Sequence, residues 1–250
     1  QHFLINREKA WRIVSALDVS PGGCVLEIGP GLGALTEILL LERGARVYAV
    51  EVSFRLSKYL ERTFGKYEGF SLYCMDFRKF DIASLPEGTK VLGNIPYRIT
   101  GEIVRKLLVE GHNRLGDIVL GLQEEVAMKM IASPGDKDWG SFSVLVQFYT
   151  EPEVLLGLGR GDFYPVPKVN SKVVKLRFKE GELPAPPERF FPFVGKLFSA
   201  RRKMLRNVLR YVEKDRLSIV KQKVDLTRRP DTLSLSELVE LFWLAEGRDG

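Results

Sequence analysis

The residues best suited to chemistry follow a short apolar run near the amino end. Val25-Leu26-Glu27-Ile28 leads directly into Gly29-Pro30-Gly31-Leu32-Gly33, and a helical pattern begins near Ala34. Glycines let the backbone approach a ligand closely, and a helix start offers unpaired N–H groups. The spacing Gly-x-Gly-x-Gly, with the acid Glu27 just before it, disfavours a dinucleotide pyrophosphate and fits a cationic ligand better. The alternative is that the turn has a purely structural role.

Two further acids follow the next expected strands. Glu51 stands twenty residues after Gly31, and Asp76 ends the third β-prone run. A carboxylate at the first position can accept both hydroxyl protons of a ribose, and one at the second can accept from the exocyclic amine of an adenine. Because the carboxyl ends of parallel strands meet in one crevice, the three acids predict S-adenosylmethionine as cofactor and S-adenosylhomocysteine as its product.

The most specific segment is Asn94-Ile95-Pro96-Tyr97, at the end of a fourth expected strand. If the Asn94 side-chain oxygen and the Ile95 carbonyl accept the two hydrogens of an adenine amine, its nitrogen lone pair is freed to attack a methyl group. Pro96 fixes φ and supplies no competing N–H. Tyr97 would stack on the extruded base and hold the amine about 3–3.5 Å from the methyl group. The alternative is a simple turn that closes a strand.

The elements that must position these residues alternate along the first 180 residues. We expect strands at 24–28, 46–50, 70–74, 90–93, 117–122, 143–150, 153–157 and 172–178, and helices at 33–43, 54–64, 99–110 and 124–132. This order predicts an α/β fold with a mostly parallel sheet, helices on both faces and an antiparallel edge. Three prolines make residues 181–187 an expected linker. Helical patterns at 188–211 and 234–245 then predict a small all-α domain over residues 188–250.

Positive charge gathers in the expected carboxyl-terminal domain. The net charge is +6, and residues 196–210 hold six basic residues and no acid. On one continuous helix over 188–211, Arg202, Arg206 and Arg210 would repeat every four residues on one face, where they could contact RNA phosphates. The alternative is an ordinary solvated helix surface.

Composition excludes several classes of site. Two cysteines, Cys24 and Cys74, are too few for a disulfide framework or a zinc cluster, and we expect both to be buried thiols. Two histidines leave little for a histidine-rich metal site or a serine hydrolase triad, so we expect no metal. No apolar run approaches about 18 residues, which predicts a soluble cytoplasmic protein without a membrane partner.

The chain resembles the KsgA family of small-subunit ribosomal RNA adenine N6,N6-dimethyltransferases. The resemblance rests on segments in the family's order along nearly the whole chain: residues 1–4, 27–36, Glu51, 76–77, 94–97, 163–169 and 198–207. It implies a Rossmann-like class I S-adenosylmethionine-dependent methyltransferase domain over residues 1–180, followed by the helical RNA-binding domain.

The resemblance also implies roles for single residues. Asn94 and Tyr97 would hold the target base, with Phe163 stacked on its other face. The methyl donor would be bound by His2, Leu4, Gly29, Gly31, Glu51, Asp76, Phe77 and Asn94, and the RNA by Arg201, Arg202, Lys203, Arg206 and Arg210. The expected product is N6,N6-dimethyladenosine at two adjacent adenines near the 3′ end of the RNA. The expected partner is the immature small ribosomal subunit, and we expect the protein to be a monomer.

Two other functions stay open at this point. The first alternative is a large-subunit ribosomal RNA adenine N6-methyltransferase of the antibiotic-resistance type. The family usually has Asn where His2 stands and Leu where Ile95 stands, and an Asn-Ile-Pro-Tyr segment also occurs in those related resistance enzymes. A mainly non-catalytic ribosome assembly factor is the second alternative. An NAD-type oxidoreductase is disfavoured by the glycine spacing.

Overall fold

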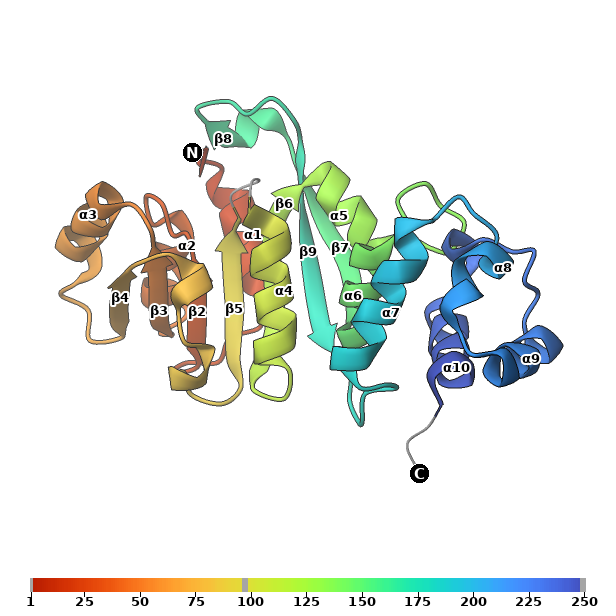
Figure 1. Ribbon diagram of the computed structural model, residues 1–250. Coiled ribbons are helices and arrows are strands. Elements are labelled where there is room, and N and C mark those ends of the chain that lie inside the picture. Colours follow the sequence, from red (N-terminus) through yellow and green to blue (C-terminus); the bar gives the residue numbers. More distant parts are fainter. Residues whose placement is uncertain (1, 96–98, 248–250) are drawn as a thin grey trace. The chain divides into compact units, whose positions relative to one another are not determined.

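The computed structural model describes residues 2–95 and 99–247 (Figure 1). The chain divides into two compact units, one formed by Gln1–Ala127 and Thr150–Lys179, the other by Met128–Tyr149 and Glu180–Gly250. We call them unit 1 and unit 2. The expected division at residues 181–187 therefore leaves out residues 128–149, which the structure groups with the carboxyl-terminal segment.

Unit 1 is built on a seven-stranded sheet with the strand order β4-β3-β2-β5-β6-β9-β7. The first five strands in this order are parallel, and β9 and β7 are antiparallel to their neighbours, which confirms the expected parallel sheet with an antiparallel edge. The strands are β2 Cys24–Ile28, β3 Arg46–Glu51, β4 Phe70–Cys74, β5 Thr89–Asn94, β6 Leu115–Gln123, β7 Thr150–Leu158 and β9 Ser171–Phe178.

The helices of this part of the chain include the four that the sequence predicts, at 33–43, 54–64, 99–110 and 124–132, and one near the amino end that it does not predict. They are α1 Arg7–Ala16, α2 Ala34–Glu37 with its π-helical continuation η1 Ile38–Glu42, α3 Phe54–Phe64, α4 Thr100–Gly111 and α5 Glu124–Ile131, with short 3₁₀ turns η2 Phe77–Lys79, η3 Ile82–Ser84 and η5 Arg160–Asp162. Ser53 starts α3 because its hydroxyl accepts from the N–H of Leu56, and Asn6 caps α1 in the same way through Lys9. In Figure 1, α4 lies in front of the sheet and α1 behind it.

A two-stranded sheet of unit 1 was not expected from the sequence. β1 Phe3–Leu4 pairs antiparallel with β8 Phe163–Tyr164, with Phe3 opposite Tyr164 and Leu4 opposite Phe163. The N–H of Ile5 extends this pairing by donating to the carbonyl of Asp162 at 2.8 Å. Two-residue strands carry no period-2 signal, so the sequence pattern does not predict them.

The expected strand at 143–150 is wrong. Residues Ser141–Tyr149 form helix α6, and the segment is rich in the β-branched and aromatic residues that favour strands. Val144, Val146 and Phe148 are all fully buried, so the helix is apolar on most of its sides rather than along one stripe. Burial within unit 2 thus overrides the local β preference.

All assigned elements in the described part of unit 2 are helical. They are α6, α7 Pro187–Ser199, α8 Leu205–Val208, η6 Leu209–Tyr211, α9 Lys214–Lys223, η7 Pro230–Thr232 and α10 Leu235–Glu246. The aromatic rings of Phe148, Phe190 and Phe242 pack in series, with centroids 5.1 and 5.6 Å apart. These contacts join α6, α7 and α10 into one core.

The expected continuous helix over 188–211 is also wrong. Helix α7 ends at Ser199, and Met204 has the extended dihedrals φ −64° and ψ 148°. The N–H groups of Leu205 and Arg206 donate to the carbonyls of Arg228 and Leu226, at 2.8 and 3.1 Å, instead of to a preceding helical turn. The cationic residues between 201 and 210 therefore do not lie on a single helix face.

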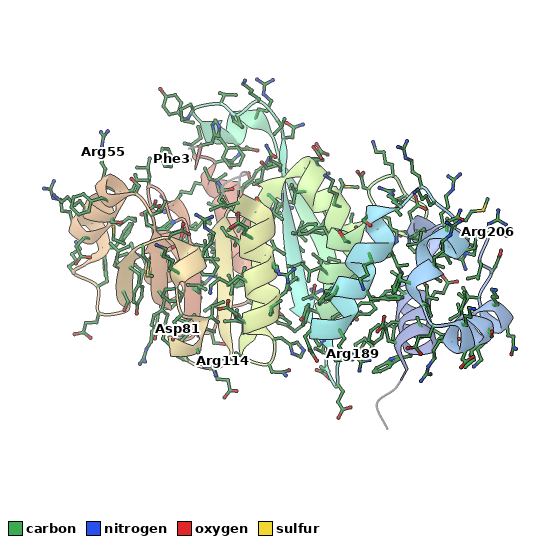
Figure 2. All side chains as sticks on the ribbon, in the orientation of Figure 1. Phe3, Arg55, Asp81, Arg114, Arg189 and Arg206 are labelled. Atoms are coloured by element: carbon green, nitrogen blue, oxygen red, sulfur yellow. The ribbon has the colours of Figure 1, made fainter. Side chains whose placement is uncertain are left out.

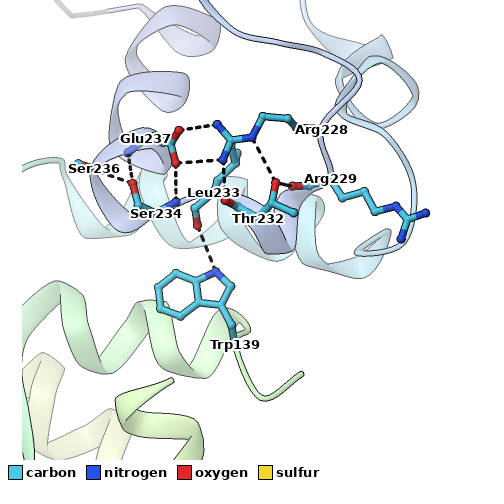
Figure 3. Close-up of polar contacts among 8 residues, drawn as sticks. All are labelled: Trp139, Arg228, Arg229, Thr232, Leu233, Ser234, Ser236 and Glu237. Carbon is cyan, nitrogen blue, oxygen red and sulfur yellow. Dashed lines mark hydrogen bonds and ion pairs between the residues drawn. The ribbon is translucent and has the colours of Figure 1, made fainter. Parts of the chain in front are cut away.

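The segment that accepts these hydrogen bonds is held by a compact polar network (Figure 3). The guanidinium of Arg228 forms a paired contact with both oxygens of Glu237, which also completes the cap of α10 by accepting from the N–H of Ser234. These donors lower the pKa of Glu237 to about 2, the Arg228 hydrogen bond contributing most. The indole N–H of Trp139 donates to the carbonyl of Leu233 at 3.2 Å, which ties residue 139 to the same cap.

Candidate functional site

A cavity of about 350 Å³ opens in unit 1 at the carboxyl ends of β2, β3, β4 and β5. Every residue predicted to bind the cofactor lines it: His2, Leu4, Gly29, Gly31, Glu51, Asp76, Phe77 and Asn94. Ile95 and Glu27 line it as well, and Met75, Ile99 and Ile103 supply apolar wall. The cavity is therefore mostly apolar with a few convergent polar groups, the usual composition of a small-molecule site.

The glycine loop has the backbone conformation that its residue types demand. Gly29, Gly31 and Gly33 have φ values of 67°, 61° and 84°, in the left-handed region that side chains disfavour. A Cβ atom on Gly31 would lie 2.9 Å from the Phe3 ring, and one on Gly33 would lie 2.4 Å from the Phe64 ring. The loop can therefore turn tightly between β2 and α2 only with glycine at these positions.

Glu51 is fixed at the end of β3 by backbone donors. Its Oε1 accepts from the N–H of Ser53 at 2.9 Å, and its Oε2 accepts from the N–H of Gly31 at 3.3 Å. A carboxylate has about four acceptor positions, so each oxygen retains one for a ligand. This arrangement suits a pair of neighbouring hydroxyl groups.

Glu27 is the least satisfied polar group in the cavity wall. It is 1% exposed, and its Oε2 accepts from the Thr36 hydroxyl at 2.6 Å, while its Oε1 is buried without a hydrogen-bond partner. Burial raises the pKa of Glu27 to about 7, and the negative charge of Glu51 adds to the effect. A positive group in the cavity would supply the missing partner. The sequence drew attention to Glu27 through its place before the glycines, although it was not among the residues assigned to the cofactor.

Asp76 lies in the cavity wall, but its carboxylate is already engaged. Its Oδ1 accepts from the backbone N–H of Arg78 at 2.9 Å, and the Arg78 side chain reaches Oδ1 through Nε at 3.1 Å and Oδ2 through Nη2 at 2.6 Å. These hydrogen bonds lower the pKa of Asp76. The same guanidinium donates through Nη1 to Glu102 at 2.9 Å. Sequence reasoning missed Arg78, because a basic residue two positions after an acid is common in turns.

Asn94 and Ile95 stand where β5 ends. The Asn94 Oδ1 atom lies 2.9 Å from where a Cβ atom of Gly121 would be, so the glycine on the neighbouring strand β6 makes room for the amide. The N–H of Ile95 donates to the carbonyl of Gly121 at 3.0 Å and fixes the backbone there. The predicted residues Pro96 and Tyr97 lie outside the described residues.

Phe163 does not line this cavity. It is 2% exposed and packs in the core with its cross-strand neighbour Leu4, which does line the cavity. Stacking of Phe163 on a base, which the resemblance implies, would require its ring to leave this packing and therefore stays a prediction.

The five cations assigned to RNA fall into two groups. Arg201 makes internal contacts in unit 2, donating to Asp231 Oδ2 and to the carbonyl of Asp136, both at 3.1 Å. The other four, Arg202, Lys203, Arg206 and Arg210, are exposed and have no acidic partner among the described residues. Figure 2 shows Arg206 at the surface of unit 2. Solvent-facing cations of this kind are available to phosphate groups.

Three further expectations can be compared with the described residues. Cys74 is exposed rather than buried, because it is the last residue of β4, and Cys24 is half-buried. Residues 2–95 and 99–247 contain no group of three or more His, Cys, Asp or Glu that could hold a metal ion. Every helix within these ranges falls short of the length and apolarity needed to cross a bilayer.

Comparisons with known proteins agree with the geometry. The family model described as Ribosomal RNA adenine dimethylase matches residues 1–245. Ribosomal RNA small subunit methyltransferase A of Thermotoga maritima is 39% identical over 242 residues, covering 97% of this chain and 82% of that protein.

Two solved structures have the same fold. A dimethyladenosine transferase from Plasmodium falciparum matches with a TM-score of 0.85 and 24% identity, covering 96% of this chain and 95% of that chain. The 23S rRNA methyltransferase ErmE matches with a TM-score of 0.76 and 27% identity, covering 98% and 99%. The family resemblance predicted from the sequence is confirmed. This chain belongs to the ribosomal RNA adenine dimethylase family.

Proposed function

We propose that this protein transfers methyl groups from S-adenosylmethionine to N6 of two adjacent adenines near the 3′ end of small-subunit ribosomal RNA. The product is N6,N6-dimethyladenosine, and the substrate is the immature small ribosomal subunit. The observation that carries the proposal is the convergence of Glu27, Glu51, Asp76 and Asn94 on one cavity in a chain of this family. We further propose that the protein acts as a monomer in the cytoplasm.

The residues in the cavity fit this cofactor by their donor and acceptor types. Glu51 would accept from both ribose hydroxyls, and Asp76 from the adenine amine. The unpaired Oε1 of Glu27 would face positive charge, which a sulfonium and an ammonium group both supply. The glycine loop would allow close approach of the chain, and the apolar wall would exclude water from the reacting groups.

The bound cofactor supplies an electrophilic methyl group on a sulfonium. The protein then has two tasks, which are to orient the substrate amine and to polarise it. The Asn94 side-chain oxygen and the Ile95 carbonyl would accept its two hydrogens, so that the nitrogen lone pair points away from them. No strong general base is required, since the amine becomes acidic only after it has gained the methyl group.

The RNA would be oriented by the exposed cations of unit 2. Arg202, Lys203, Arg206 and Arg210 would contact phosphates, which fix position without reading sequence. Small-subunit RNA is favoured over large-subunit RNA because the curated relatives at 35–41% identity bear the small-subunit name. A role in small-subunit maturation is compatible with both methyl transfer and docking.

The test incubates the protein with methyl-labelled S-adenosylmethionine and immature small subunits, then digests the RNA and identifies the labelled nucleoside. We expect N6,N6-dimethyladenosine from small subunits and none from large subunits. Asn94→Ala and Tyr97→Ala should abolish turnover and leave the far-ultraviolet circular dichroism unchanged. Label only in large-subunit RNA would transfer the assignment to the resistance type, and full activity of Asn94→Ala would refute the role of the amide.

A further inference from the structure

An aromatic surface begins in the cavity wall and continues to the outside of unit 1. Phe3 lines the cavity, and Tyr164 stands directly opposite Phe3 in the β1–β8 pair. Directly opposed residues of an antiparallel pair project to the same face, with Cβ atoms about 4.5–5.5 Å apart. Tyr164 is 67% exposed, so its ring lies one side chain away from the cavity wall and faces solvent.

The backbone that carries Tyr164 is firmly held. The His2 ring donates through Nδ1 to the carbonyl of Pro165 at 2.7 Å, and Arg160 Nε donates to the carbonyl of Pro167 at 2.8 Å. On the other side, Asp162 accepts from Asn6 at 2.7 Å and pairs with Lys9. Because these contacts fix the backbone on both sides of residue 164, little backbone entropy remains to be lost when a partner covers the Tyr164 ring.

The charges around this ring favour an anionic partner. Arg160 and Lys168 are exposed and have no acidic partner among residues 2–95 and 99–247. The acid of the segment, Asp162, is buried and neutralised by Lys9. Exposed aromatic rings flanked by cations that have no acidic partner are the surface that single-stranded nucleic acids bind, with a base on the ring and phosphates on the cations.

We infer that Tyr164 stacks on the nucleobase next to the adenine being methylated, while Lys168 contacts the adjoining phosphate. The inference rests on the proposed function, since the cavity must admit one adenine of an adjacent pair. The neighbouring base then has to lie just outside the cavity, which is where the Tyr164 ring is. Phe163 is unsuited to this position because it is buried against Leu4.

The experiment compares Tyr164→Ala and Tyr164→Phe with the unmodified protein. The matched control is Tyr59→Ala, because Tyr59 is also an exposed tyrosine of unit 1, at 44%, but does not line the cavity. We measure the Kd for immature small subunits, the Kd for their protein-free RNA, the KM and kcat of methylation, and the Kd for S-adenosylmethionine by calorimetry.

Tyr164→Ala should raise the Kd and KM for subunits and for free RNA by about 10- to 100-fold, the range of one lost base stack. Tyr164→Phe should stay within about twofold of the unmodified protein, because the π face is retained. The cofactor Kd should change in none of the variants, and Tyr59→Ala should bind RNA normally.

Several results would overturn the inference. Unchanged RNA affinity of Tyr164→Ala excludes a stacking role, and equal losses in the alanine and phenylalanine variants point to the hydroxyl instead of the ring. A loss with whole subunits but not with free RNA identifies a ribosomal protein as the partner. If the unmodified protein binds subunits but forms no dimethyladenosine, the proposed function fails, and the two Kd values still decide the role of Tyr164.

Discussion

Thr36 donates its hydroxyl hydrogen to only one oxygen of Glu27, at 2.6 Å, and the other oxygen is buried with no partner. A half-paired buried carboxylate is costly, because ionisation in a low-dielectric site lacks compensation. Burial therefore raises the pKa of Glu27 to about 7 in the free protein, and a cationic ligand would lower it again. The half-paired state of Glu27 thus couples the protonation of its carboxyl group to the binding of a cationic ligand in the cavity.

The first prediction concerns stability and pH. The pKa of Glu27 rises from 4.5 to about 7 on folding, so the folded state holds a proton that the unfolded state releases. The free energy of unfolding should fall by about 3 kcal/mol as pH rises from 4.5 to 7. Above pH 7 it should no longer change because of Glu27. Urea titrations at pH 5 and pH 8 measure this difference. Glu27→Gln should remove most of it, and a variant with the full pH dependence would exclude Glu27 as its source.

The second prediction concerns cofactor affinity. A cation in the cavity favours ionised Glu27, so the affinity for S-adenosylmethionine should increase as pH rises through 7, with release of a proton on binding. Calorimetry in buffers of different ionisation enthalpy measures the proton count. Glu27→Gln should bind about tenfold more weakly at pH 8 and show little pH dependence. Retained proton release in this variant would assign the titration to another group.

A third prediction follows from the contact between Arg78 and Asp76. The Arg78 side chain takes acceptor positions that a cofactor amine needs, whereas the Arg78 backbone N–H alone keeps Asp76 oriented. Arg78→Met should therefore lower the Kd for S-adenosylmethionine by about threefold, the size of one competing hydrogen bond. The control is Glu102→Gln, which removes the negative charge of the second partner of Arg78 and leaves Asp76 unchanged. Weaker binding in Arg78→Met would mean that the guanidinium positions Asp76.

The fourth prediction tests the position of Asn94. A Cβ atom at residue 121 would lie 2.9 Å from the Asn94 oxygen, so Gly121→Ala must displace the amide. We expect kcat to fall about 100-fold, the cost of a displacement near 1 Å, with a smaller change in cofactor Kd. Gly101→Ala is the matched control, since nothing lies within 4 Å of a Cβ there. A normal kcat for Gly121→Ala would show that the amide position is not critical.

The fifth prediction separates the cations of unit 2. Replacing Arg202 and Arg206 with Ala should reduce the slope of log affinity for RNA against log salt by about 2, since each phosphate contact adds about one. Arg201→Ala should leave that slope unchanged and lower the urea midpoint, because Arg201 bonds to Asp231 and Asp136. Filter binding between 50 and 300 mM salt measures the slopes. An unchanged slope in the double variant would exclude these two contacts.

Most of the cavity could be predicted because its residues sit at ends of strands. Glu51, Asp76 and Asn94 each terminate or follow a parallel strand, and parallel strands bring such positions to one edge. The glycine loop could be predicted because few residue types other than glycine adopt the left-handed backbone conformation found at Gly31. The sequence does not predict the hydrogen-bond partners of these residues, such as Arg78 for Asp76, because those partners depend on side-chain geometry.

The wrong predictions share a different cause. At residues 143–150 the composition favours a strand, but burial on several sides stabilises a helix. Near residue 204 the helical periodicity of the sequence continues, but the helix is interrupted because the backbone there hydrogen-bonds to Leu226 and Arg228. Both depend on contacts with segments far away in the sequence. Local periodicity contains no information about such contacts, so it locates elements reliably only where one face is buried.

The pairing of β1 with β8 also sets an order of events during synthesis. The contact between His2 and Pro165 spans 163 positions, so that wall of the cavity cannot close until the chain has grown past residue 165. Chains emerge from the ribosome amino end first, and contacts of long sequence separation form late. Nascent chains that end before β8 therefore lack this wall of the cavity.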